Sequence, residues 1–192
     1  MTLEVLNTIA SIGTLLVIAA TAIAALGQLR HMRGNNQIVA LTECREVLES
    51  EGFMRALRFV VRELHEHLKD PKTRAALMQA PLEEELRAVN VVGNFFESMG
   101  SFVKHDIIDE AIAMDLWSGI VVQAWEHLVP ALGVMRRIAG VGLWENFEYL
   151  AAIAEAYTAS HPSGTYPADK PRLKVEDTWA TEDKALGIYT PR

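Results

Sequence analysis

The sequence predicts an all-α protein with one N-terminal transmembrane helix, a helical bundle of about five helices, and an irregular C-terminal tail. Three observations carry this prediction. No charged residue occurs from Val5 to Gln28. Apolar residues then recur at helical spacing as far as Thr158. After Ser160 the chain holds four of its seven prolines and loses that periodicity. We therefore predict an anchor at 1–33, a helical domain at 34–159 and an extended tail at 160–192.

The first expected helix is the uncharged segment 5–28. Roughly 20 apolar residues, rising about 1.5 Å each, match a hydrocarbon core of about 30 Å. Basic residues follow the run at Arg30, His31 and Arg33, whereas only Glu4 precedes it. The positive-inside rule then predicts a single-pass protein of the bacterial inner membrane, with its N-terminus outside and its C-terminal domain in the cytoplasm. A cleaved signal peptide and a buried helix of a soluble bundle are the two alternatives.

A polar stripe crosses this segment, because Asn7, Thr14, Thr21 and Gln28 recur every seven residues. Small and weakly polar residues allow helices to approach closely in lipid. The stripe predicts a helix–helix interface within the membrane, with a second copy of the chain or with another membrane protein, while the lipid bilayer contacts the rest. The alternative is that the hydroxyl groups bond to carbonyls of their own helix.

Five further helices are expected in order. An amphipathic stretch runs over 38–68, with Gly34-Asn35-Asn36 as a hinge before it and Gly52 as a break or kink. Asp70-Pro71 begins a short helix that Pro81 closes. The next helix covers 81–103. Asp109 caps the following one, which Pro130 should end or kink, and Gly140-Val141-Gly142 separates it from a last helix over 143–158.

Composition and motifs exclude several classes of function. The formal net charge is -7 and the pI is near 5.4, which argues against a nucleic-acid partner. Cys44 is the single cysteine, so no intrachain disulfide can form. Nucleotide-binding, hydrolase and zinc-protease motifs do not occur. In His65-Glu66-His67 the two imidazoles point about 200° apart on a helix and cannot share an ion. We therefore expect no cofactor, no metal and no catalytic residue.

Polar residues inside apolar helices are the remaining candidates for a polar core or a ligand site. A carboxylate in a core is costly unless it is paired or its pKa is raised. Such groups can mark proton or ligand chemistry. They can equally be structural, bonded to the indole N–H of a tryptophan or to Arg136 and Arg137. The candidates are Asn94, Glu97, Trp125, Glu126, Asn146 and Glu148.

Several segments resemble an uncharacterised bacterial family, domain of unknown function 4760. They are NTIASIGTLLVIAATAIAALGQLRHMR, VGNFFESMGSFVKHDIIDEAIAMDLW, QAWEHLVP and WENFEYLA, which together cover most of the chain up to about Ala159. The resemblance implies an N-terminal span and a helical domain. It marks Asn94, Glu97, Trp125, Glu126, Asn146, Phe147 and Glu148 as motif positions without assigning them roles. The tail lies outside it.

Three functions fit these observations. The first is a membrane-anchored interaction or scaffold subunit of a homo- or hetero-oligomeric complex, with no catalysis of its own. The alternative is a regulatory or sensory module, in stress or phage defence, whose helical domain binds a small ligand or partner in an apolar pocket lined by some of Asn94, Glu97, Trp125 and Glu148. The third is an enzyme that pairs Glu97 with Glu126 or Glu148, and it requires two carboxyl groups in one cavity.

Overall fold

The computed structural model describes residues 3–188, and their side chains except at 4–6, 8–10, 26, 29–36 and 85. Within this range the chain is all-helical and contains no strand. It divides into two compact units, and the boundary along the chain falls between Pro162 and Ser163. The elements are α1 (Leu3–Glu49), α2 (Glu51–Arg62), α3 (Leu64–His67), α4 (Pro71–Ala76), the 3-10 helix η1 (Glu84–Leu86), α5 (Arg87–Lys104), α6 (Glu110–Ala139), α7 (Glu145–Ser160) and α8 (Ala180–Ala185).

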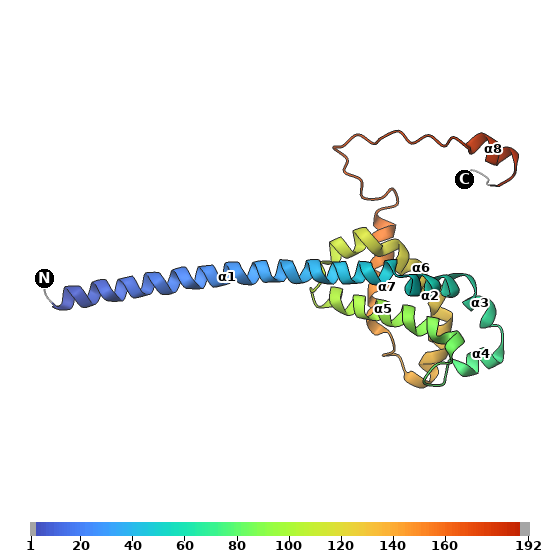
Figure 1. Cartoon of the computed structure of the whole chain (residues 1–192), viewed down its shortest axis with the longest axis horizontal. Coiled ribbons are helices and arrows are strands. Elements are labelled where there is room, and N and C mark those ends of the chain that lie inside the picture. The colour runs from blue at the N-terminus through green and yellow to red at the C-terminus, as the bar shows by residue number, and fades with distance from the viewer. Residues whose placement is uncertain (1–2, 189–192) are drawn as a thin grey trace. The chain divides into compact units, whose positions relative to one another are not determined.

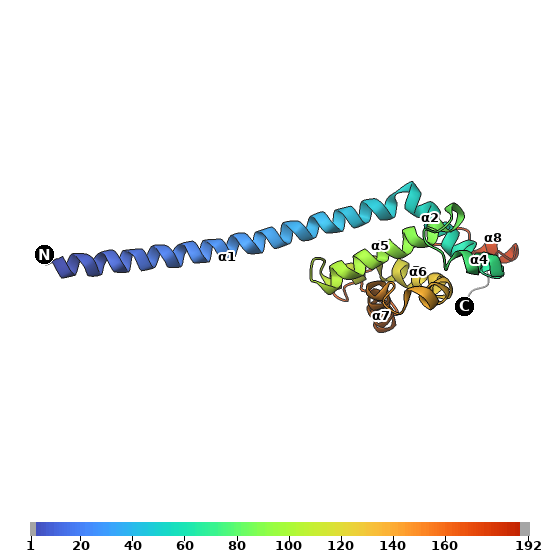
Figure 2. The ribbon, with the colours of Figure 1, turned by 90° about the horizontal axis from the view of Figure 1, so that it is seen from below.

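Helix α1 is one continuous helix of 47 residues (Figures 1 and 2). It passes through Gly34–Asn36 without interruption, where we expected a hinge. Among its described side chains, those that are buried in the bundle are Ala40, Cys44 and Leu48, which follow at four-residue spacing on one face of its C-terminal part. The helix ends before Ser50, whose hydroxyl accepts from the backbone N–H of Phe53 and so caps α2.

The predicted transmembrane anchor and inner-membrane localisation are wrong. In the part of the chain that the structure describes, no helix combines the length and the apolar character needed to cross a bilayer. The uncharged segment is the N-terminal part of α1, and the same helix continues to Glu49. The basic residues from which the orientation was predicted, Arg30, His31 and Arg33, lie outside the described side chains.

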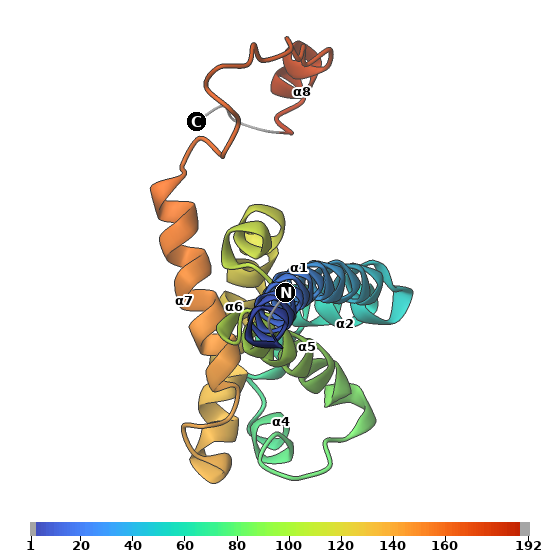
Figure 3. The ribbon, with the colours of Figure 1, turned by 90° about the vertical axis from the view of Figure 1, so that its left-hand side faces the viewer.

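The core of the first unit lies between α2, α5, α6 and α7, with the end of α1 beside it (Figure 3). Helix α7 packs most extensively against α5 and α6. Aromatic side chains fill the centre, where Phe96 stacks on Phe147 with ring centroids 5.0 Å apart. Phe53 of α2 meets Phe96 edge to face at 6.1 Å. Three separate helices thus share one apolar centre, so the bundle is stabilised mainly by burial of these rings.

Local sequence features set most helix ends. Asp70 accepts from the N–H of Lys72, and Asp109 accepts from that of Ile112, as expected of N-cap residues. Gly140, with φ of 82°, follows the last residue of α6. Pro130, by contrast, does not end α6, which continues to Ala139. The flanking residues Leu128, Ala131 and Leu132 are buried, and this packing outweighs the hydrogen bond that proline removes.

The second unit begins at Ser163, within the segment 160–192 that we predicted as a tail. It is irregular from Ser163 until α8, a six-residue helix that we did not predict. Within it the guanidinium of Arg172 lies 4.7 Å from the ring centroid of Tyr166, and the Tyr166 hydroxyl donates to the carbonyl of Pro171. Most of its apolar side chains are exposed, including Leu173, Val175 and Trp179.

Candidate functional site

Three of the six predicted polar residues, Asn94, Glu97 and Asn146, gather where the start of α7 crosses α5, a region called here the α5–α7 junction. The first N–H groups of a helix have no partner within the helix. Trp144, at the N-cap of α7, offers no side-chain cap. Glu97 of α5 supplies one instead: its Oε2 accepts from the backbone N–H of Phe147 at 2.9 Å, and its Oε1 accepts from the Asn146 amide at 2.7 Å. A carboxylate at this positive helix end is also favoured electrostatically.

The Trp144 side chain fills a socket on α5. Its backbone is left-handed, with φ of 55°, and its side chain is only 3% exposed. The indole N–H donates to Oδ1 of Asn94 at 2.9 Å. The ring lies directly over Gly93, where a Cβ would sit 2.1 Å from a ring carbon. Glycine is therefore required at position 93 for the indole to reach Asn94.

A second glycine allows the backbones themselves to approach. A Cβ on Gly100 would lie 2.1 Å from the backbone oxygen of Asn146. One turn further on, the Lys104 ammonium donates to Oδ1 of Asn146 at 3.1 Å. Gly93, Glu97, Gly100 and Lys104 share one face of α5 because they follow at intervals of four, three and four residues. The interface thus extends over three turns of the helix.

The connection between α6 and α7 is held from the other side by Arg136. Its guanidinium donates to the carbonyl of Leu143 through Nε at 3.0 Å and Nη2 at 2.8 Å. Nη2 also pairs with Oε2 of Glu148 at 2.7 Å. Because the Arg136 side chain is 21% exposed, this pair is better shielded than the surface pairs elsewhere in the chain. Both ends of the turn that begins α7 are therefore fixed.

The six candidates for a polar core or ligand site have different surroundings. Asn94, Glu97 and Asn146 meet at the junction, and Trp125 contacts the buried Phe147 edge to face at 5.1 Å. Glu148 is paired with Arg136, while Glu126 is exposed on α6. Both oxygens of Glu97 accept hydrogen bonds from α7, so a structural role explains why a carboxylate lies at this point of α5. Sequence reasoning missed Gly93, Gly100 and Lys104, although the seven-residue spacing of the two glycines around Glu97 indicates a close helix contact. It named Trp144 as one of three possible indole donors, with Trp117 and Trp125, and Trp144 is the one that bonds to Asn94.

The predicted stripe on α1 lies on an exposed surface: the side chains of Asn7, Thr14, Thr21 and Gln28 are all exposed. Thr21 donates to the carbonyls of Val17 and Ile18, each at 2.9 Å. Ser11 next to the stripe donates to the Asn7 carbonyl, also at 2.9 Å. These hydroxyl groups are satisfied by their own helix.

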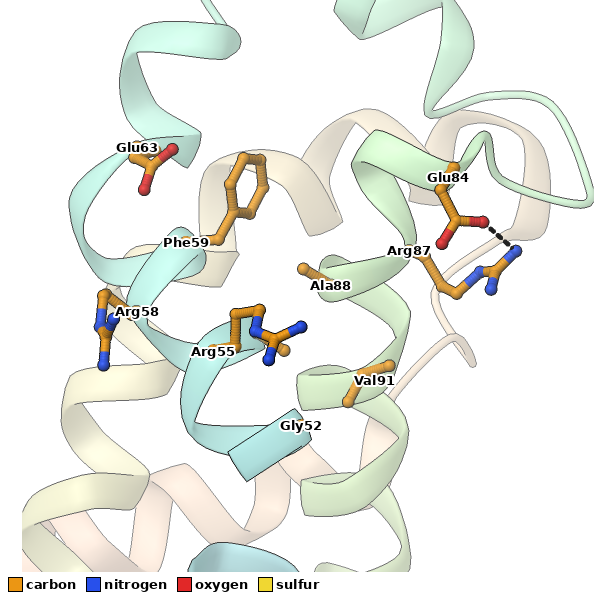
Figure 4. Close-up of a pocket in the computed structure, with 10 residues that line it drawn as sticks. Gly52, Arg55, Arg58, Phe59, Glu63, Glu84, Arg87, Ala88 and Val91 are labelled. Atoms are coloured by element: carbon orange, nitrogen blue, oxygen red, sulfur yellow. Dashed lines mark ion pairs between the residues drawn. The ribbon is translucent and has the colours of Figure 1, made fainter. Parts of the chain in front are cut away.

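A groove of about 460 Å³ lies between α2 and α5 (Figure 4). Phe59 projects towards α5, and Ala88 and Val91 form the opposite wall. Three arginines and two glutamates also line it. Arg55 pairs with Glu51 at 2.5 Å, and Arg87 pairs with Glu84. Because these charges are largely compensated within the chain, the groove offers little selectivity for an anionic ligand.

Cys44 is expected to resist alkylation in the folded protein. Burial, assisted by the charge of Glu43, raises the pKa of the Cys44 thiol to about 11. Only the thiolate reacts, and a pKa about two units above its ordinary value leaves roughly a hundredfold less thiolate at about pH 8. We expect N-ethylmaleimide to modify the folded chain about a hundredfold more slowly than the chain unfolded in guanidinium chloride. Equal rates in the two states would contradict the buried position.

The family model described as Domain of unknown function (DUF4760) matches residues 15–153, which include most of α1, most of the bundle and the α5–α7 junction. No curated protein and no solved structure matches the chain.

Proposed function

Because the chain belongs to the family Domain of unknown function (DUF4760), whose description assigns no activity, we propose a function from its exposed surface. The protein is an assembly subunit that oligomerises with further copies of itself through the N-terminal half of α1. The α2–α7 bundle is a rigid module carried by that assembly. The observation that supports this proposal is the unbroken exposure of large apolar side chains along α1.

Every side chain from Ser11 to Ala25 is exposed. The six large apolar ones among them are between 54% and 71% exposed: Ile12, Leu15, Leu16, Val17, Ile18 and Ile23. Burying one such side chain contributes about 1.5–3 kcal/mol, so covering most of them contributes on the order of 10 kcal/mol. That is enough to offset the loss of translational and rotational freedom on association.

The spacing of these residues favours identical helices as the cover. Ile12, Leu16, Ala19 and Ile23 follow at intervals of four, three and four residues, which is the a/d pattern of a coiled coil. Leu15 lies beside this seam and widens it. A seam wider than a and d alone is typical of assemblies of more than two helices.

The polar stripe lies on the opposite side of this seam. In the same heptad register Thr14, Thr21 and Gln28 fall at position f, which faces away from a coiled-coil interface. The proposal therefore moves the assembly interface from the stripe, where we first predicted it, to the apolar seam.

The mass of the full chain in aqueous buffer tests this proposal. Light scattering after size exclusion, without detergent, is expected to give the mass of three or more chains. Replacing Leu16 and Ile23 together with glutamine should reduce it to that of a monomer, because two buried anchors per chain are lost. The matched control replaces Thr14 and Thr21 with glutamine, on the same helix but outside the seam, and should leave the oligomer intact.

Two outcomes would contradict this assembly. One is a parent chain that is monomeric in water. The other is a parent chain that is recovered only with detergent or lipid vesicles, which would mean that lipid rather than protein covers α1. Circular dichroism of each variant confirms that the helical content is retained.

A further inference from the structure

A second cavity, of about 310 Å³, lies between the segment 77–82, the first half of α5 and the end of α6. Its walls are mainly apolar, including Leu77, Met135 and Leu143. Ile138 also lines the cavity and is 71% exposed, so it lies where the cavity opens to solvent. The volume falls at the lower end of the range of about 300–1,000 Å³ found for small-molecule sites.

Two amide side chains of α5 line one wall of this cavity. Asn90 and Asn94 are one helical turn apart and so share a face of the helix. Asn90 is half-buried and makes no hydrogen bond to any described residue, and its amide atoms still reach solvent, so they are open to a ligand that enters the cavity. Asn94 uses its oxygen to accept from Trp144, and its amide nitrogen donates to no described group. Both amides therefore have donors available to a ligand.

The lining also indicates the charge of that ligand. None of the residues around this cavity is ionisable, in contrast to the arginine-containing groove of Figure 4. A charged molecule would lose hydration here without gaining a counter-charge, which is costly. An uncharged carbonyl, however, can accept from the two asparagine amides while an apolar body contacts the remaining walls.

We propose that this cavity binds a small neutral molecule with an apolar body and a carboxamide or similar carbonyl group. The carbonyl accepts from Asn90 and Asn94. The ligand site is continuous with the α5–α7 junction, because Asn94 also holds the Trp144 indole and Leu143 also accepts from Arg136. Occupation of the cavity therefore stabilises the start of α7. This inference is independent of assembly through α1.

Benzamide and benzoate are a suitable pair of probes, since they share the ring and differ in charge. Saturation-transfer NMR on the full chain is expected to show binding of benzamide and at least tenfold weaker binding of benzoate. Asn90→Leu keeps the size of the side chain but removes one hydrogen-bond donor. It should weaken benzamide binding about fivefold to tenfold, the effect of one hydrogen bond. Ala139→Phe, at an exposed position of the lining, should abolish binding by filling the cavity.

The control introduces the same phenylalanine side chain into the groove between α2 and α5. Val91 lines the groove of Figure 4 and is 41% exposed, so Val91→Phe should leave benzamide binding unchanged. The unfolding temperature of each variant, measured without probe, shows whether the fold is retained. Equal binding of benzamide and benzoate would overturn the proposal, as would benzamide binding that survives both Asn90→Leu and Ala139→Phe.

Discussion

Gly100→Ala is expected to lower the free energy of unfolding by about 2–4 kcal/mol, although alanine normally favours a helix over glycine. The reason is the close approach of α5 and α7. The new Cβ would lie 2.1 Å from the backbone oxygen of Asn146 and 2.6 Å from its carbonyl carbon. Backbone atoms cannot rotate aside as a flexible side chain does. The start of α7 must therefore move away from α5, which also disturbs the hydrogen bonds of Glu97.

Gly119→Ala is the matched control, because Gly119 lies inside α6 with nothing within 4 Å of the position of a Cβ. Here only the intrinsic preference of a helix for alanine over glycine acts, and we expect the free energy of unfolding to rise by about 0.5–1 kcal/mol. Denaturant unfolding at one fixed protein concentration measures both variants, since association would otherwise shift the midpoint. The opposite signs are the test: a Gly100→Ala protein as stable as the Gly119→Ala protein would show that the helices are not in contact here.

Features that depend on neighbouring residues were predictable from the sequence. Asp70 and Asp109 cap the helices that follow them, and Gly140 separates α6 from α7, because each acts on N–H or carbonyl groups within a few residues. The all-helical class rests on the same local periodicity and is confirmed by the absence of strands between residues 3 and 188.

Features that depend on packing between distant residues were not predictable from the sequence. Pro130 was expected to end or kink α6, and the helix does not end there, because buried neighbours hold it together. Gly34–Asn36 was expected to form a hinge, yet the helix continues through it. The uncharged run in α1 suggested a membrane span from composition alone. No helix among the described residues has the length and apolar character that such a span requires.

The α5–α7 junction was predictable from the sequence only in part. Asn94, Glu97 and Asn146 stood out as polar residues in apolar helices, and the structural alternative named for them, a bond to a tryptophan indole, is present between Asn94 and Trp144. The role of Glu97 could not be predicted, because it caps a helix that begins 48 residues further along the chain. No local pattern encodes a cap that comes from another helix.

Glu97→Ala should therefore destabilise the bundle by about 2–4 kcal/mol, since two donors at the start of α7 lose their acceptor in a half-buried place. The donors are the backbone N–H of Phe147 and the amide of Asn146. Glu97→Gln should lower the free energy of unfolding by less, about 1–2 kcal/mol. It retains one oxygen for Phe147 but turns an amide nitrogen towards Asn146 and removes the negative charge at the helix end.

The control for charge loss on the surface is Glu126→Ala, at the exposed position on α6, which should change stability by less than about 0.5 kcal/mol. Denaturant unfolding ranks the three variants, and circular dichroism shows whether α7 still forms. A ranking in which Ala is worst, Gln intermediate and the α6 control neutral identifies Glu97 as the cap of α7. If Glu97→Ala proved as stable as Glu126→Ala, capping would not explain the carboxylate, and a binding or catalytic role for Glu97 would become the better account.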